Sequence, residues 1–532
     1  MMTSPCSLSR AAAVLLAIVA AIYALANIGD TAASETLLVA SGARSAYERA
    51  VATDAVLLLA QRLGDAGNSK EAARIYRTLW KQRTDPAERH VRCAAILGLA
   101  NSQGIDAMDE LVAAMNSADL QIRAAATQAA VSMPGEDVTK KWVAHLESVS
   151  ADAKPGVIAL LAERGGEAAR GAVVDAMRER DEGVRLAAIE AARAFKGTST
   201  VPPLIAFLAS KDGKAHDAAQ KSLERIPGDE ASAAIASALG AAAPEVRRDL
   251  LGVLTVRGAR QHSDAVMAAT KDRDKGVQES ALRALEVLGE EKHVPAIVDI
   301  VVKTDTGSVR GAAEKALGAI CGRSNRDNCV KSILPAMAGA GVDAKCALIR
   351  VLGKVPSPKG LDAVRAALKG SDARIQDAAV RALSEWPSRA VAPDLLQIAR
   401  RGRSRTQQVL ALRGFVRLVK EQKFKNADKV AMYKGAMVAA KRPDEKKMIL
   451  SALGEVKDIA AVKLIAASLG DAALREEAAA AAVRIGRDFR GDVRKEPLRQ
   501  IIVPTMQKVL EISKNKNVRR DAERVLKEAR RK

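Results

Sequence analysis

Residues 180–197 read RDEGVRLAAIEAARAFKG, and variants of this line recur along most of the chain. Counted from Val184, apolar residues stand at offsets 0, 4, 8 and 11, and a glycine follows. These offsets fall on one face of a helix with 3.6 residues per turn, so they predict a buried stripe. The glycine predicts where that helix ends.

This sequence pattern recurs with a fixed period. Its anchor residue recurs at six successive intervals of 31 residues from Val91 to Val277, and looser copies continue to Val518. Between copies lies a second apolar run, such as VPPLIAFLAS from Val201, whose prolines suit the first turn of a helix. Neither helix can bury its apolar face alone, so we predict helix pairs stacked around one continuous core.

The segments DEGVRLAAIEAARAF, DKGVQESALRALEVLG and TGSVRGAAEKALGAI resemble HEAT repeats in a short form of about 31 residues. The resemblance extends from about Ala87 to the C-terminus. It implies an all-α fold, an α-α superhelix or HEAT-repeat solenoid. It says little about function, because HEAT proteins are mostly scaffolds with many unrelated partners.

The segment before the array, from Leu57 to Pro86, reads as another helix pair. Its Gly67, Ala72 and Tyr76 resemble a tetratricopeptide repeat. A degenerate repeat that caps the array is the alternative, since repeat arrays need capped ends.

Two polar positions recur at fixed places relative to the anchor of the repeat. The first is an aspartate three residues before the anchor, expected to cap the second helix; it occurs at Asp119, Asp181, Asp212, Asp274, Asp372 and Asp471. The second is a basic residue directly after the anchor; it occurs at Arg92, Arg123, Lys154, Arg185, Arg247, Arg310, Arg475 and Arg519. We interpret the two as an Asp–Arg ladder that ties repeat to repeat, rather than as ligand-binding arginines.

The N-terminus differs from the array. Residues Ala11–Ile28 carry no charge and follow Arg10, which predicts a signal peptide or signal anchor of a bacterial protein. Cleavage would fall near Ala26 or Ala33, and an uncut segment of this length would just span a bilayer. The array would then be exported to the periplasm or cell envelope. A buried helix of the solenoid is the alternative.

These features predict five segments: a signal peptide or anchor (1–28), a linker (29–46), the helix pair (47–86), near-neutral repeats (87–388) and strongly basic repeats with a C-terminal cap (389–532). Of the formal net charge of +21, residues 389–532 carry +18, from 35 basic and 17 acidic residues. Basic turns of successive repeats would line up along one edge of a solenoid. We therefore expect a docking surface formed by Arg400, Arg401, Arg403, Arg405, Lys420, Lys423, Lys425, Lys441 and Arg442.

The expected partner of this surface is an acidic protein or an anionic membrane. A plain solvated surface is the alternative. Export and the scarcity of aromatic rings in the basic repeats argue against nucleic acid. The competing functional hypotheses are a nucleic-acid-binding solenoid tethered to the membrane from inside and an accessory subunit of an enzyme.

The sequence contains no constellation that predicts catalysis. The five histidines are far apart, and no zinc-protease, serine-hydrolase or phosphate-loop motif occurs. We predict a protein that is not an enzyme, without cofactor, metal or small-molecule substrate. Cys321 and Cys329 flank a turn between two helices, where they form either one local disulfide or two free thiols.

Overall fold

The computed structural model describes residues 5–530, with side chains from residue 13 onward except at residue 490. The described chain contains helices and turns and no strand, as the predicted all-α class requires. It divides into two compact units, Met1–His262 and Ser263–Lys532. The boundary predicted from charge at residue 388 falls inside the second of these units.

The helices of the first unit are α1 (Pro5–Ile28), α2 (Ala33–Ala40), α3 (Ala46–Asp65), α4 (Ser69–Gln82), η1 (Pro86–Glu88), α5 (Arg89–Gln103), η2 (Gly104–Ala107), α6 (Met108–Met115), α7 (Leu120–Ser132), α8 (Glu136–His145), α9 (Lys154–Arg164), α10 (Glu167–Ala176), α11 (Glu182–Ala191), η3 (Ala192–Ala194), α12 (Val201–Leu208), α13 (Gly213–Arg225), α14 (Asp229–Ala238), α15 (Pro244–Val256) and η4 (Arg260–His262).

The helices of the second unit are α16 (Ser263–Ala269), α17 (Lys275–Leu288), η5 (Glu291–His293), α18 (Val294–Lys303), α19 (Gly307–Arg323), α20 (Arg326–Ala338), α21 (Val342–Lys354), α22 (Pro358–Lys369), α23 (Ala373–Glu385), η6 (Arg389–Val391), α24 (Ala392–Arg401), α25 (Arg405–Glu421), α26 (Asn426–Ala439), α27 (Pro443–Leu453), α28 (Ile459–Ala466), α29 (Arg475–Asp488), η7 (Arg490–Arg494), α30 (Leu498–Ile512) and α31 (Lys516–Arg530).

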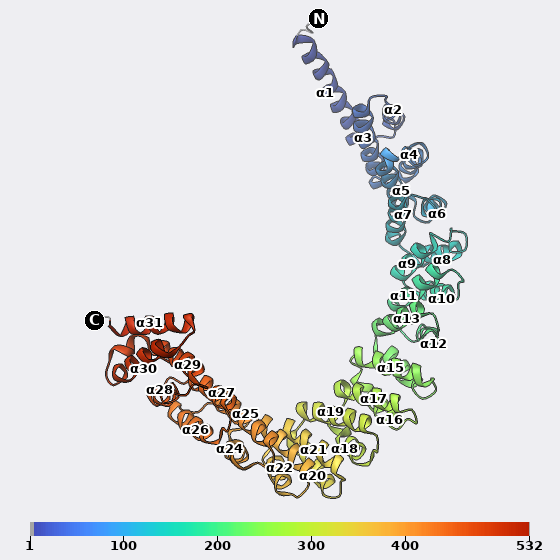
Figure 1. Ribbon diagram of the computed structural model, residues 1–532. Coiled ribbons are helices and arrows are strands. Elements are labelled where there is room, and N and C mark those ends of the chain that lie inside the picture. Colours follow the sequence, from blue (N-terminus) through green and yellow to red (C-terminus); the bar gives the residue numbers. More distant parts are fainter. Residues whose placement is uncertain (1–4, 531–532) are drawn as a thin grey trace. The chain divides into compact units, whose positions relative to one another are not determined.

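Within each unit the helices form two layers (Figure 1). In the first unit the second helices of the repeats, α5 to α15 in odd numbers, pack one against the next. In the second unit α17, α19, α21, α23, α25, α27 and α29 do the same, and the first helices, such as α18, α20 and α22, form the other layer. This is the stacked arrangement of helix pairs that the period predicts.

The predicted buried stripe is confirmed. On α17 the stripe residues Val277, Ala281, Leu285 and Leu288 are all 0% exposed. The proline-led runs also form the predicted first helices, α12 and α18, with proline in the first turn.

Five of the six aspartates cap the second helix as predicted. Asp372, for example, accepts the backbone N–H groups of Arg374 at 2.9 Å and Ile375 at 3.1 Å. Asp471 differs, because α29 begins only at Arg475 and its carboxylate instead accepts the N–H of Ala473.

The predicted Asp–Arg contact between repeats is found at Arg185, whereas Arg123, Arg310 and Arg519 donate to carbonyls of their own repeat. In several repeats the side chain directly after the anchor, either arginine or glutamine, donates to the carbonyl six residues earlier, at the end of the first helix. These bonds join Arg123 to Ser117 O (2.8 Å), Arg185 to Glu179 O (3.2 Å), Gln278 to Asp272 O (2.6 Å), Gln376 to Gly370 O (2.5 Å) and Gln408 to Gly402 O (2.7 Å). Such a side chain therefore satisfies free carbonyls within its own repeat. Arg185 also pairs with Asp212 of the next repeat at 3.2 Å.

Successive repeats are joined by a different set of arginines, near the ends of the second helices. Arg257 donates to the carbonyls of Leu223 and Ile226, both at 2.7 Å, in the preceding repeat. Arg164 and Arg417 make equivalent bonds to the repeats before theirs. These contacts have no counterpart in the predictions from sequence.

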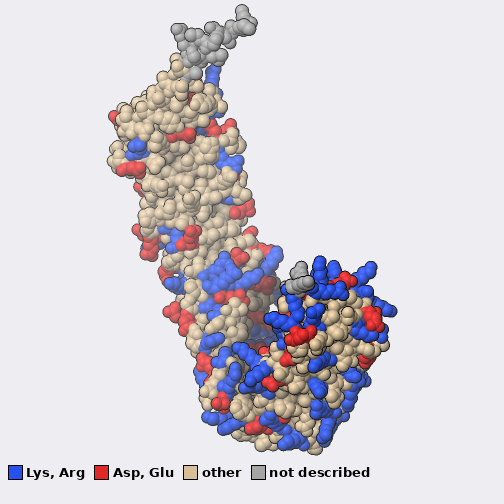
Figure 2. Space-filling view, turned by 90° about the vertical axis from the view of Figure 1, so that its left-hand side faces the viewer, with Lys and Arg blue, Asp and Glu red and all other residues tan. Residues whose placement is uncertain are grey.

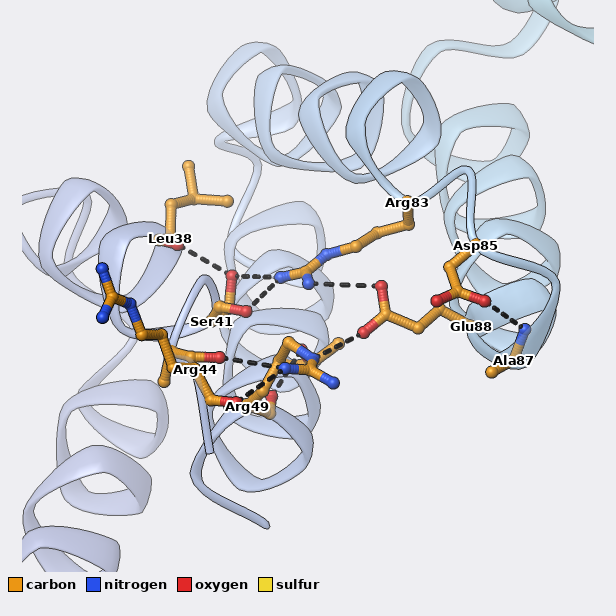
Figure 3. Close-up of polar contacts among 10 residues, drawn as sticks. Leu38, Ser41, Arg44, Arg49, Arg83, Asp85, Ala87 and Glu88 are labelled. Carbon is orange, nitrogen blue, oxygen red and sulfur yellow. Dashed lines mark hydrogen bonds and ion pairs between the residues drawn. The ribbon is translucent and has the colours of Figure 1, made fainter. Parts of the chain in front are cut away.

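The segment 29–46 is not the linker predicted from sequence. It contains α2, which packs on α3 and buries Leu37 to 1% exposure. Figure 3 shows how the turn after α2 is held: Arg83 donates to the carbonyl and hydroxyl of Ser41 and faces Glu88 at 3.4 Å. Arg49 approaches the same Glu88 carboxylate at 2.8 Å.

The C-terminal end of α1 packs on α3. Ala26 is 0% exposed, and Asn27 accepts a hydrogen bond of 2.8 Å from Arg62. Farther up α1, Val14 and Leu16 are 60% and 70% exposed. Across the residues whose placement is described, no helix is both long and apolar enough to cross a membrane.

The helix pair predicted for 47–86 corresponds to α3 and α4. Tyr76 of α4 packs so closely on α5 that a Cβ at Gly98 would overlap its ring, and burial raises the pKa of Tyr76 to about 12. Whether the pair is a tetratricopeptide repeat or a degenerate HEAT-like repeat stays an open prediction.

Candidate functional site

Basic side chains gather on the second unit. Figure 2 shows lysine and arginine side chains crowding the surface around the C-terminal helices, while the surface near the N-terminal helices carries few charges on the face shown. This distribution follows the charge count along the sequence.

The nine predicted docking residues lie at two different edges. Six of them flank the turns α24–α25 and α26–α27: Arg400, Arg401, Arg403, Arg405, Lys441 and Arg442. The other three, Lys420, Lys423 and Lys425, lie at the far end of α25, a helix of 17 residues and therefore about 25 Å long. Because neighbouring helices are antiparallel, residues close in sequence face opposite edges, and the nine do not form one strip.

A groove opens between α22 and α24, at the edge that carries the six residues. It has a volume of about 490 Å³ and is lined by side chains of α22 and α24 and by the starts of α23 and α25. We call it the α24 groove; the residues that matter below are Arg365, Lys369, Gln376, Asp394, Arg401 and Arg403.

The α24 groove carries an excess of positive charge. Arg365 is neutralised by Asp394 at 2.8 Å, and this pair raises the pKa of the arginine. Lys369, Arg401 and Arg403 are exposed and make no ion pair within the described part of the chain. Three cations therefore remain available to an anionic group.

A buried amide lies in the lining of the same groove. Gln376 is 4% exposed, and no donor among the described residues reaches its Oε1 atom. One repeat later, the equivalent Gln408 accepts a hydrogen bond of 3.0 Å from Lys441. A buried acceptor without a partner costs free energy, so an N–H donor that reaches this atom by displacing part of the lining would be favoured.

A second, smaller groove of about 350 Å³ follows along the edge and includes Arg405, Lys441 and Arg442. Its cations are largely occupied. Arg442 pairs with Glu445 at 2.9 Å, and Lys441 donates to Gln408. This groove is therefore a weaker anion site than the α24 groove.

The opposite edge is more nearly neutral. Lys420 pairs with Glu455 at 2.8 Å, and Lys457 lies 3.5 Å from Asp492. Lys423 and Lys425 are exposed and make no ion pair with any described residue, yet they line none of the grooves described above. Of the predicted residues, Arg401 and Arg403 are thus the two that lie in the most cationic groove.

The sequence reasoning missed Lys369 and Gln376. Both come from the repeat before the basic run, so the composition of residues 389–532 gives no signal for them. Gln376 could have been found at the position after the anchor, where half of the repeats carry an arginine.

No metal or catalytic centre emerges from the described residues. They contain no group of three or more His, Cys, Asp and Glu side chains that could hold a metal ion. His293, which is 4% exposed, bonds Asp264 at 2.8 Å, and this contact lowers the pKa of Asp264. Such a pair is explained by packing at the start of α18.

The predicted cysteine pair is brought together as two free thiols. Cys321 and Cys329 are both 0% exposed, and the interaction between their thiols raises the pKa of Cys321 and lowers that of Cys329. The structure holds both cysteines as free thiols, and the disulfide between them stays a prediction.

The layers and their period define the chain as an α-solenoid of stacked helix pairs. Residues 232–318 match the family model described as HEAT repeats. A comparison with curated proteins finds no match.

Solved structures with a similar fold include karyopherins. Yeast importin-beta (Kap95p) is 13% identical with a TM-score of 0.35, over 94% of this chain and 79% of that one. Kap121p bound to the extreme C-terminus of the protein phosphatase Cdc14p is 12% identical with a TM-score of 0.44, over 80% of this chain and 56% of that one. Kap95p in a study of its binding to RanGDP is 13% identical with a TM-score of 0.40, over 94% and 72%. At these identities and TM-scores the similarity is distant.

Proposed function

We propose that the chain is a non-catalytic scaffold that binds an acidic, extended segment of a protein partner in the α24 groove. The observation that carries the proposal is the convergence of three exposed cations without ion pairs on the lining that holds Gln376. Carboxylates of the partner would meet Lys369, Arg401 and Arg403, while a backbone N–H of the partner would satisfy the Gln376 carbonyl oxygen.

An extended peptide supplies this combination of groups. It presents side-chain carboxylates and backbone N–H donors within a few ångströms of each other, whereas a phosphate or a bare carboxylate has no N–H to donate. Arginine favours such a partner because its planar fork can bind a carboxylate through two hydrogen bonds. The wider positive field of residues 389–532 would speed encounter with an acidic protein, most strongly at low salt.

Charge neutralisation in the groove is the direct test. The variant Arg401→Gln/Arg403→Gln should bind a fluorescein-labelled peptide of alternating glutamate and serine about tenfold more weakly than the unchanged full chain at low salt, because each exposed ion pair contributes at most about 1 kcal/mol. Fluorescence anisotropy over a series of salt concentrations measures both the affinity and its salt dependence. The variant should also show the shallower salt dependence.

The matched control is Lys423→Gln/Lys425→Gln, which removes the same charge at the opposite edge. It should change the affinity less than twofold. Equal weakening by both variants would show that only net charge matters, and that the α24 groove is not the binding site. A single-stranded oligonucleotide that outcompetes the peptide at equal charge would favour the nucleic-acid alternative instead.

We further propose that Ala11–Ile28 directs the array out of the cytoplasm, into the periplasm or cell envelope. The support is the uncharged run itself and the exposure of its apolar side chains, with Ile18 45% and Ile28 72% exposed. Alkaline phosphatase fused after residue 532 should be active in bacterial cells, because that enzyme requires an oxidising compartment. Inactive fusions with intact protein would place the array inside the cell.

A further inference from the structure

Cys321 and Cys329 lie on either side of the turn that joins α19, the second helix of one repeat, to α20, the first helix of the next. Cys321 lies in the last turn of α19 and Cys329 in the first turn of α20, and the chain reverses between them. Both side chains are fully buried, and each thiol is the largest influence on the pKa of the other. The other two cysteines with described side chains, Cys93 and Cys346, lie in other repeats.

The turn that holds the pair is fixed from both sides. Arg323 donates to the carbonyl of Gly289 at 2.7 Å. Glu291 accepts the backbone N–H of Asn325 at 3.1 Å and the side-chain amide of Asn328 at 2.8 Å. Because α19 and α20 are each tied to the preceding repeat, the folded turn keeps the two cysteines on neighbouring helix ends and favours the link once the turn closes.

The two thiols differ in reactivity. The interaction between the two thiols lowers the pKa of Cys329 and raises that of Cys321. Cys329 also lies in the first turn of α20, where the free N–H groups of the helix favour a negative charge. Cys329 is therefore the nucleophile of the pair.

We propose that Cys321 and Cys329 are a reversible thiol–disulfide modification site that joins α19 to α20 in an oxidising compartment. With glutathione disulfide as oxidant, the Cys329 thiolate attacks one of its sulfur atoms and releases one glutathione thiolate. The Cys321 thiolate then attacks Cys329 in the mixed disulfide and releases the second glutathione. Two electrons pass from the cysteines to glutathione disulfide, and the two cysteine protons end on the two glutathione thiols.

Burial controls the rate of this exchange. Both sulfur atoms are 0% exposed, so the oxidant reaches them only when the α19–α20 turn opens locally or before the repeat has folded. We therefore expect the folded chain to be oxidised more slowly than a chain refolded in the presence of glutathione disulfide.

The test counts free thiols in the full chain, which contains five cysteines. The protein is refolded in glutathione redox buffers, denatured, alkylated and weighed intact, and the linked peptides are then mapped. Three alkyl groups instead of five, with Cys321 linked to Cys329, is the expected result in the oxidising buffer. Five alkyl groups at every redox ratio, or glutathione adducts without an internal link, would overturn the proposal.

Single substitutions test the order of attack. Cys321→Ser should accumulate glutathione on Cys329, while Cys329→Ser should react at least several-fold more slowly at Cys321. Cys346→Ser, the control in a neighbouring repeat, should leave the link intact. The thiol count on the unchanged chain decides the question even where a serine variant fails to fold.

Discussion

Replacing Arg83 with methionine should lower the free energy of unfolding of the unit Met1–His262 by about 3 kcal/mol. The Arg83 side chain is only 9% exposed and lies between two helices and a turn. It donates to the backbone carbonyl of Ser41 and, at 2.8 Å, to the Ser41 hydroxyl. Methionine keeps the apolar stem but offers no donor, so the Ser41 carbonyl would lose its partner while still buried, and the half-buried Glu88 carboxylate would keep only Arg49.

The loss should be local. Native-state hydrogen exchange should show faster exchange in α2 and in the first turns of α3, and urea unfolding should show the lower stability of the first unit. Arg44→Met is the matched control, because Arg44 lies beside the cluster in Figure 3 but its side chain is exposed. That control should stay within about 0.5 kcal/mol of the unchanged chain. A similar loss in both variants would mean that the Arg83 cluster does not hold α2.

The fold was predictable because the apolar stripe that builds its core recurs with a fixed period in the sequence. The stripe on α17 needs only small or aliphatic residues at helical spacing, and the sequence shows those residues directly. The contacts between repeats were not predictable in the same way. Arg257 donates to backbone carbonyls of Leu223 and Ile226, and a carbonyl belongs to every residue, so its role leaves no pattern in the sequence.

The candidate site was predictable only in part, for a geometric reason. Arg401 and Lys420 belong to one basic region of the sequence, yet an antiparallel helix carries them to opposite edges. Lys369, by contrast, precedes that region and reaches the groove from the neighbouring repeat. Residues that share one edge of a solenoid lie about one period apart in the sequence. The charge count of residues 389–532 therefore identifies the unit that carries the groove, but not the edge on which the groove lies.

The groove also shows how one repeat can differ from its neighbours. Where the residue after the anchor is arginine, as in Arg123, all its polar atoms are donors, and it can satisfy a carbonyl without leaving an acceptor. A glutamine makes the same bond through its amide N–H but keeps an oxygen. In Gln408 that oxygen is taken by Lys441, and in Gln376 it has no partner among the described residues. One substitution at a repeated structural position thus leaves an acceptor without a partner in the lining of the groove that we propose as a binding site.

Gly414→Val should destabilise the unit Ser263–Lys532 by about 3 kcal/mol, although valine is the better helix former. Gly414 lies in the middle of α25, where a Cβ atom would stand 2.7 Å from both the Cα and the carbonyl oxygen of Ser384 in α23. Those are backbone atoms, so no side-chain rotation can relieve the overlap, and α23 and α25 would have to separate.

Separation would also break the hydrogen bond of 3.0 Å from Arg417 to the Ser384 carbonyl. Gly311→Val is the matched control, since Gly311 is also inside a helix of this unit but has no atom within 4 Å of its Cβ position. That variant should change stability by at most about 0.5 kcal/mol. Hydrogen exchange of α23 and α25 distinguishes the two, because repeats contact only their neighbours and the opening should stay near α23–α25. Unchanged exchange in Gly414→Val would mean that these helices are not held at the distance described here.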